Sequence, residues 1–282
     1  MNFQIQILRY YFSFLSTIFP KYASLKAFKL FQKVKNKSIR DREKDFYKKA
    51  KHFKVSSNSA DILCYDLSPE NKKLVFLLHG WESNAGSLSK IAFSLSKNNY
   101  RVISFDLPGH ANYKSNYTNI YECKEAFKLV LKFINPKEPF NVIAHSFGSA
   151  VTTYALSKEK YIIDHMIFLT SPNYMLDIFK DFKNLIKLSD TSFSLLLNMA
   201  QKVLNREIRD LNIEEEINSI SFSKLLLIHD QYDKIIPFKN SQNIALKNQT
   251  RTKLIKHQNI GHYKMLWNDN VIENILKFLK KE

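Results

Sequence analysis

Two residues of this 282-residue chain stand out as a candidate nucleophile and a candidate base, Ser146 and His262. A serine hydroxyl becomes a nucleophile when a histidine takes its proton. The chain has only five glycines, and two of them, Gly148 and Gly261, lie beside these residues. Glycine permits a sharp turn or a close approach of backbone. These residue types at these places are suited to covalent catalysis.

The segment around Ser146 combines an apolar run, a small-x-Ser-x-small turn and a helix start rich in small residues. It resembles the nucleophile elbow, a strained strand-to-helix turn that exposes a serine Oγ and needs small neighbours. Ala144 stands where glycine is usual, and alanine is a tolerated variant because it is nearly as small. Such short patterns also recur by chance, and the competing interpretation is that Ser146 only N-caps a helix.

Two earlier segments extend the resemblance. Residues 74–81 read Leu-Val-Phe-Leu-Leu-His-Gly-Trp, and residues 106–110 read Asp-Leu-Pro-Gly-His. Both are similar to strand ends of the α/β-hydrolase fold. The resemblance implies that the backbone N–H groups of Trp81 and Phe147 form the oxyanion hole. It also implies a structural, hydrogen-bonding role for His79 rather than a catalytic one.

The acid of the triad is assigned by the same resemblance. Residues 226–237 are similar to the penultimate strand and acid loop of these hydrolases, which places the carboxylate at Asp233. Asp230 is interpreted as a loop residue, and Asp177 occupies the place where some relatives carry the acid. His262 follows the last predicted strand, as the family's catalytic histidine does. Ser146, Asp233 and His262 thus keep the chain order of this fold.

The chain is therefore identified as a member of the α/β-hydrolase superfamily over roughly residues 60–280. The resemblance implies that His262 takes the proton of Ser146, that Asp233 orients His262, and that an acyl-enzyme forms and is hydrolysed. It implies neither a cofactor nor a metal, and no H-E-x-x-H motif or carboxylate cluster suggests one.

The elements that must position these residues alternate between short apolar runs and amphipathic stretches. Strands alternating with helices indicate βαβ crossovers, and so an α/β fold with a mostly parallel, doubly wound sheet. The expected strands are 61–67, 74–79, 101–106, 141–145, 165–170, 224–229 and 253–257, and the expected helices 86–95, 120–134, 147–156 and 271–279.

One interval is too long for a crossover. Residues 174–223 contain helical patterns at 175–188, 193–203 and 211–220, and they predict an inserted helical cap over the carboxyl ends of the strands, where open α/β sheets bind ligands. The hydrolase domain is expected over residues 55–282.

Residues 1–54 are predicted to form a basic, amphipathic N-terminal extension. They carry +11 of the formal net charge of +17. The apolar stretch from residue 7 to 19 is shorter than the roughly 20 apolar residues that a transmembrane helix needs. From residue 22 to 34, apolar residues alternate with lysines at a helical period. This helix either lies on an anionic membrane or packs on the domain, and the sequence leaves both open.

Composition narrows the classes of function. Two widely separated cysteines, Cys64 and Cys123, argue against a disulfide framework and fit a reducing, cytoplasmic compartment. A nucleic-acid partner is not expected, because the basic excess lies outside the region that carries the chemistry. The prediction is a serine hydrolase of esters or thioesters with a small or hydrophobic acyl group. A non-catalytic binding protein, an acyltransferase and a peptidase of the same fold stay as alternatives. The sequence does not indicate the oligomeric state.

Overall fold

The computed structural model describes residues 3–57 and 61–280. The chain forms two compact units, each built from two separate stretches of sequence. The sheet unit comprises residues 34–173 and 213–280. The helical unit comprises residues 3–33 and 174–212. Each unit is described below by itself.

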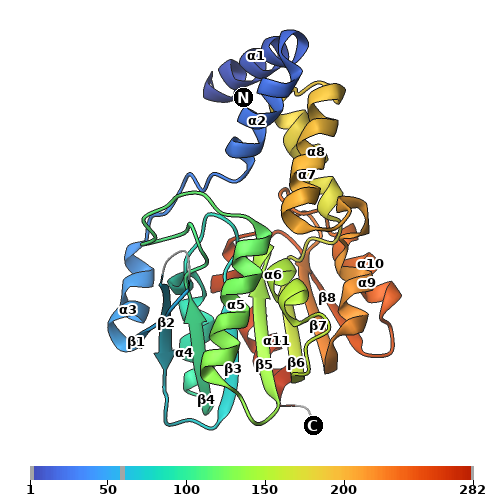
Figure 1. Cartoon of the computed structure of the whole chain (residues 1–282). Helices are drawn as coiled ribbons and strands as arrows, with labels where there is room; N and C mark the ends of the chain where they lie inside the picture. The colour runs from blue at the N-terminus through green and yellow to red at the C-terminus, as the bar shows by residue number, and fades with distance from the viewer. Residues whose placement is uncertain (1–2, 58–60, 281–282) are drawn as a thin grey trace. The chain divides into compact units, whose positions relative to one another are not determined.

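The sheet unit is built on one eight-stranded sheet with the order β1-β2-β4-β3-β5-β6-β7-β8 (Figure 1). β1 and β2 run antiparallel to their neighbours, and the other pairs are parallel. The central strands are continuous apolar runs, as expected where helices cover both faces. The strands are β1 (Lys51–Val55), β2 (Ile62–Leu67), β3 (Lys73–Leu78), β4 (Tyr100–Phe105), β5 (Phe140–His145), β6 (Ile162–Leu169), β7 (Ser221–Asp230) and β8 (Thr252–His257).

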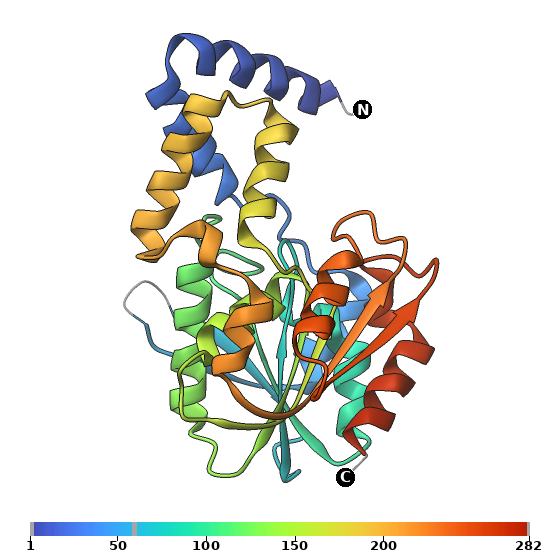
Figure 2. The ribbon, with the colours of Figure 1, turned by 90° about the vertical axis from the view of Figure 1, so that its right-hand side faces the viewer.

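Helices pack on both faces of this sheet (Figures 1 and 2). One group contains α3 (Asp41–Lys49), α4 (Ser89–Ser96) and α11 (Asp269–Leu279), with the 3₁₀ turns η1 (Ala85–Leu88) and η4 (Lys264–Trp267). The other contains α5 (Ile120–Ile134), α6 (Phe147–Leu156), α9 (Ile213–Glu216) and α10 (Lys239–Lys247), with the turn η3 (Ile217–Ser219). α5 shows why they form. It buries Cys123, Phe127 and Val130 on one stripe at helical spacing.

The predicted α/β-hydrolase architecture, with its mostly parallel sheet, is what the structure shows, but the expected extension is divided differently. The expected boundary after residue 54 falls inside β1, and residues 34–54 belong to the sheet unit. β1 is an edge strand in which Lys51 and Lys54 are exposed. Charged side chains protect an edge strand from pairing with other chains, and they also remove the apolar run by which a strand is recognised.

The helical unit contains α1 (Phe3–Ile18), α2 (Pro20–Phe31), α7 (Met175–Ile186), α8 (Asp190–Leu204) and the turn η2 (Ile208–Asp210). α1 packs on α2 and α7, and α2 packs on α8. Phe31 of α2 stacks on Phe179 of α7 with ring centroids 4.3 Å apart. Ser192 Oγ donates to the carbonyl of Pro20, 3.0 Å away. The N-terminal helices and the inserted helices therefore form one body.

The inserted segment also differs from the expectation at its C-terminal end. The pattern predicts one helix over residues 211–220, but the stretch forms the short helix α9 and the 3₁₀ turn η3, and the helical unit ends at residue 212. Asn173 anchors this stretch within the sheet unit, because its carbonyl accepts from Ile213 N and its side chain accepts from Glu214 N. The local hydrogen bonds of Asn173 start α9 afresh there, which breaks the expected helix.

Candidate active site

Ser146 lies on a strained turn between β5 and α6. Its backbone has φ 51° and ψ −119°, a conformation that a residue with a Cβ adopts only when its surroundings enforce it. The backbone enforces it here, since Ser146 N donates to the carbonyl of Leu169 on the neighbouring strand β6 at 2.9 Å. Ser146 is the N-cap residue of α6, but its side chain makes no capping hydrogen bond. The hydroxyl is therefore held out of the helix, as in a nucleophile elbow.

The turn around Ser146 requires glycine at Gly148. A Cβ there would lie 2.6 Å from the carbonyl oxygen of Leu78 and 2.7 Å from that of His79. Real Cβ atoms do not make such contacts, so α6 could not pack this closely on the end of β3 with any larger residue. Gly148 thus brings the Ser146 turn against the segment that ends at Gly80 and Trp81.

The two residues predicted to supply the oxyanion donors are in contact through their side chains. The rings of Trp81 and Phe147 make an edge-to-face contact with centroids 5.2 Å apart. Phe147 N is the first amide of α6, where helix N–H groups have no partner within the helix. A Cβ placed on Gly80, the residue before Trp81, would lie 3.3 Å from Ser146 Cβ. Gly80, which precedes Trp81, and Phe147 are therefore both close neighbours of Ser146.

Asp233 and His262 are joined directly. His262 Nδ1 donates to Asp233 Oδ2 at 2.7 Å. Asp233 lies in the loop after β7, and its other oxygen, Oδ1, accepts from the amides of Ile235 and Ile236 at 2.8 and 3.1 Å. A proton on His262 Nδ1 leaves Nε2 free to accept another proton. Ser146 Oγ forms no hydrogen bond within the described part of the chain. The hydrogen bond between a catalytic serine and its histidine is often long without substrate and shortens when substrate binds.

His229 is a buried partner of the acid that sequence reasoning missed. Its Nε2 lies 3.5 Å from Asp233 Oδ2 and 2.9 Å from the carbonyl of Ile236, while Nδ1 pairs with Ser241 Oγ at 2.7 Å. Burial alone would raise the pKa of Asp233, but hydrogen bonds from His229 and His262 outweigh it and hold this pKa well below the ordinary value. Asp233 is thus kept ionised and fixed.

Asp230 is more than the loop residue that the sequence suggested. It is fully buried at the end of β7 and accepts hydrogen bonds from the amides of Tyr232, Ile260 and Gly261. Gly261 has φ +78° and directly precedes His262. Burial alone would raise the pKa of Asp230, and these amides more than offset it, so the pKa is lowered. One carboxylate therefore ties the acid loop to the loop that carries the histidine.

His145, the residue before the serine, ties the same histidine loop to β5. His145 Nε2 lies 3.1 Å from the carbonyl oxygen of His262 and donates to it. The two imidazole rings are 4.8 Å apart. Complete burial, with the nearby His262, lowers the pKa of His145 to about 3, so its ring is neutral. Ser146 and His262 are brought to the same end of the sheet by this contact.

The other candidates have structural surroundings. His79 is buried, pairs with the carbonyl of Gly80 and accepts from Leu107 N, as expected of a structural histidine. Asp106 is buried, and burial raises its pKa to about 6 although Ala85 N and two tyrosine hydroxyls donate to it. Asp177 lies in the first turn of α7, is exposed and pairs with Lys180 at 3.5 Å. Asp233 is the acid that contacts His262.

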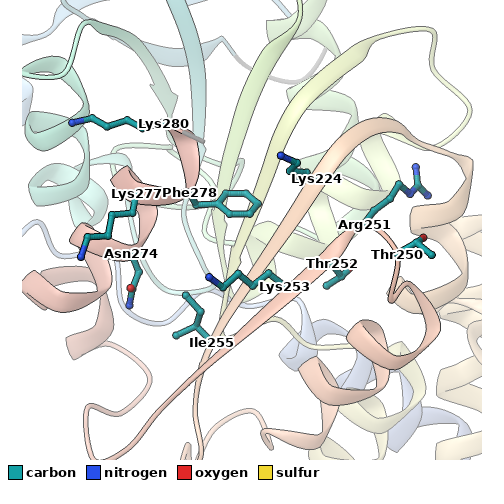
Figure 3. Close-up of a pocket in the computed structure, with 10 residues that line it drawn as sticks. All are labelled: Lys224, Thr250, Arg251, Thr252, Lys253, Ile255, Asn274, Lys277, Phe278 and Lys280. Carbon is teal, nitrogen blue, oxygen red and sulfur yellow. The ribbon is translucent and has the colours of Figure 1, made fainter. Parts of the chain in front are cut away.

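A basic groove of about 510 Å³ lies away from these residues (Figure 3). Phe278 of α11 projects into its centre, and Lys224 and Lys253 belong to the amino-terminal parts of β7 and β8. Asp230 and the acid loop follow the carboxyl end of β7. The groove and the serine site therefore lie at opposite ends of the strands. The five cationic side chains of the basic groove are Lys224, Arg251, Lys253, Lys277 and Lys280.

Comparisons with known proteins show the family of the chain. Residues 69–234, more than half of the chain, match the family described as "Serine aminopeptidase, S33". Two mycoplasma proteins named "Putative esterase/lipase 2" are similar. The Mycoplasma pneumoniae protein is 23% identical, over 70% of this chain and 85% of its own length. The Mycoplasma genitalium protein is 34% identical, over 31% of this chain and only 34% of its own length.

The fold is shared with the Pyrococcus furiosus esterase Pf2001. Its structure superposes with a TM-score of 0.66 at 20% sequence identity, covering 88% of this chain and 96% of the esterase. The strand order, the turn at Ser146 and the match over residues 69–234 lead to one assignment. The chain belongs to the serine aminopeptidase S33 family of the α/β-hydrolase superfamily.

Proposed function

We propose that the protein is a serine esterase that cleaves carboxylic esters or thioesters with a small or hydrophobic acyl group through an acyl-enzyme. The observation that carries this proposal is the 2.7 Å hydrogen bond between His262 Nδ1 and Asp233 at the same end of the sheet as the strained Ser146. The similarity to proteins named as esterases supports the choice of ester substrates.

The reaction begins with proton transfer from Ser146 Oγ to His262 Nε2 as the oxygen attacks the acyl carbon. Asp233 stays ionised and stabilises the imidazolium that forms. The imidazolium then gives its proton to the leaving alcohol or thiol, and the acyl group remains on Ser146. A water molecule, deprotonated by His262, attacks the acyl-enzyme, and the acid leaves as Ser146 regains its proton.

The developing oxyanion is assigned to the amides of Trp81 and Phe147. Loss of one such donor lowers turnover by an amount equivalent to roughly 3–4 kcal/mol. The helix N-terminus at Phe147 adds partial positive charge at the same place. These groups are fixed before substrate arrives, because Gly80 and Gly148 pack tightly against their neighbours.

A fluorophosphonate probe tests the assignment of the nucleophile. Wild-type protein should be labelled, and Ser146→Ala should lose both the label and hydrolysis of p-nitrophenyl esters. Ser149→Ala, which changes a buried serine one turn into α6, is the matched control and should keep both. Labelling that survives in Ser146→Ala would contradict the proposal.

The alternatives give different outcomes in the same assay. The family description favours aminopeptidase chemistry as a competitor, so amino-acid p-nitroanilides should be assayed beside esters and thioesters of graded chain length. Faster turnover of the anilides would make the protein a peptidase. No turnover and no labelling would favour a binding protein on the same fold, and products formed only with an added alcohol would indicate an acyltransferase.

A further inference from the structure

α1 carries apolar side chains on two sides. Phe12 is buried within the helical unit at 2% exposure. On the other side, Phe3, Tyr10 and Phe14 are 73%, 77% and 67% exposed. Large aromatic side chains that are exposed together on one side of a helix form a patch of the kind that marks a contact with a partner. The exposed side of α1 is therefore a candidate surface for contact with a partner.

The exposed apolar surface continues onto the start of α2. We call it the outer face; it consists of Phe3, Ile7, Tyr10, Tyr11, Phe14, Ile18, Phe19, Tyr22 and Leu25. Six of these nine residues are aromatic. Contiguous apolar patches are uncommon on soluble monomers and mark protein or membrane contacts. Tyrosine is enriched where one end of a side chain meets lipid and the other meets water.

The charged residues of α1 and α2 themselves have one sign. Residues 1–33 contain five basic residues and neither Asp nor Glu. Lys21, Lys26 and Lys29 are exposed on α2, and the Lys26 ammonium lies 5.1 Å from the centre of the Tyr22 ring. Cations around an apolar helix face are suited to an anionic surface, and each contributes about 1 kcal/mol near anionic lipid.

From this juxtaposition we propose that α1 and the start of α2 dock on the surface of an anionic lipid bilayer, with the outer face inserted among the headgroups. A second copy of the chain is less suited to this position, because a symmetric contact would bring the same lysines together with no acid in either segment. The contact is peripheral. Across the described residues, no helix is both long and apolar enough to cross a membrane, and the 16 residues of α1 span roughly 24 Å.

Vesicle sedimentation of the full-length chain tests the proposal. Phosphatidylcholine vesicles with phosphatidylglycerol should carry the protein down, and vesicles of phosphatidylcholine alone should carry much less. Raising the salt concentration should release it. Ser146→Ala should bind equally well, so binding is read independently of any hydrolysis. Equal binding to both kinds of vesicle, or none to either, would overturn the proposal.

Variants separate the apolar and the charged contributions. Tyr10→Ser with Phe14→Ser should weaken partitioning by at least roughly tenfold, and changing Lys21, Lys26 and Lys29 to Gln by roughly fivefold for each lysine. Two matched controls should bind like the wild type. One changes Leu246 and Ile162, which are exposed at 65% and 59% on the sheet unit, to Ser. The other changes Lys224, Lys253 and Lys280 of the basic groove to Gln (Figure 3).

Sedimentation equilibrium and thermal unfolding of each variant distinguish the other outcomes. The outer-face variants should keep the wild-type melting temperature and the wild-type turnover of water-soluble esters. A dimer that the Tyr10→Ser, Phe14→Ser pair dissolves, with vesicle binding unchanged, would assign the outer face to a second copy instead. Equal loss of binding in the basic-groove control would show nonspecific charge attraction and contradict the proposal.

Discussion

The loops that hold the candidate triad differ from the helices of the N-terminal segment in how completely their side chains are paired. Around His262, almost every polar group has a fixed partner: Asp233 on its ring, Asp230 on the amides before it, and His145 on its carbonyl. Around α1, apolar side chains are left in solvent. A site that must keep one geometry is fixed by hydrogen bonds from several elements. A surface that binds a partner instead leaves its apolar side chains exposed until the partner is present. The difference can be probed one residue at a time.

The largest effect is expected at the acid itself. Asp233→Asn should lower kcat by about 10⁴ because the amide no longer holds His262 in the productive tautomer. Asp177→Asn on α7 is the control and should stay within about tenfold of wild type, equivalent to less than 1.4 kcal/mol. Steady-state hydrolysis of a p-nitrophenyl ester measures both. A large loss of kcat in Asp177→Asn would instead assign the catalytic acid to Asp177, which follows the earlier strand β6.

The two sides of α1 should respond differently to truncation. Phe12→Ala removes a ring that is 2% exposed and should lower the free energy of unfolding by roughly 3–5 kcal/mol. Phe14→Ala removes the same ring from a site that is 67% exposed and should change it by less than about 0.5 kcal/mol. Chemical denaturation of both variants provides the comparison. Similar losses would mean that the outer face is covered by the protein itself.

Asp230 should show an intermediate effect. Asp230→Asn places an NH₂ group against amides that need an acceptor, which should lower kcat by roughly 10- to 100-fold through misplacement of Gly261 and His262. This expectation goes beyond the sequence interpretation of Asp230 as a loop residue. Since Asp230 acts through His262, rates of fluorophosphonate labelling should fall in parallel with turnover. A stability loss with normal labelling would limit Asp230 to a structural role.

The smallest effect is a dependence of stability on pH. The pKa of Asp230 and that of Asp233 are lowered in the folded chain, so both carboxylates stabilise the fold above their unfolded pKa of about 4. This contribution is lost as the pH falls below that value. The stability difference between wild type and Asp230→Asn, less than about 3 kcal/mol at pH 7, should therefore narrow in acid. Denaturation curves from pH 7 to pH 3 would measure this stability difference. A difference that grew in acid would contradict the lowered pKa of Asp230.

The sheet could be predicted from sequence because its signals are local. The apolar runs of β3 and β5, and the helix of α5 over residues 120–134, follow directly from the pattern of side chains. Ser146, Asp233 and His262 were assigned by the resemblance to the α/β-hydrolase family, in which the triad residues follow such runs. β1 was not predicted because its lysines interrupt the apolar run that identifies a strand. α10 was not predicted because its short, polar sequence does not differ from that of a loop.

The supporting residues of the site could not be predicted in the same way. Asp230 and Gly261 are far apart in sequence, and only the pairing of β7 with β8 brings them together. In the sequence, His145 and His229 stand only at the ends of predicted strands. Their contacts with His262 and Asp233 are visible only in the folded chain. Likewise, no local signal shows that α1 and α2 pack with α7 and α8, since that partnership joins segments separated by most of the sheet.

The order in which the helical unit can be assembled follows from its two separate stretches. Residues 3–33 leave the ribosome before their partner helices, which begin only at residue 175. At ordinary synthesis rates of 5–20 residues per second, the delay is on the order of ten seconds. During that time α1 can pack on α2 but lacks its later partner α7. A chaperone, or the lipid that we propose as the later partner of the outer face, is then positioned to bind α1 before the rest of the protein does.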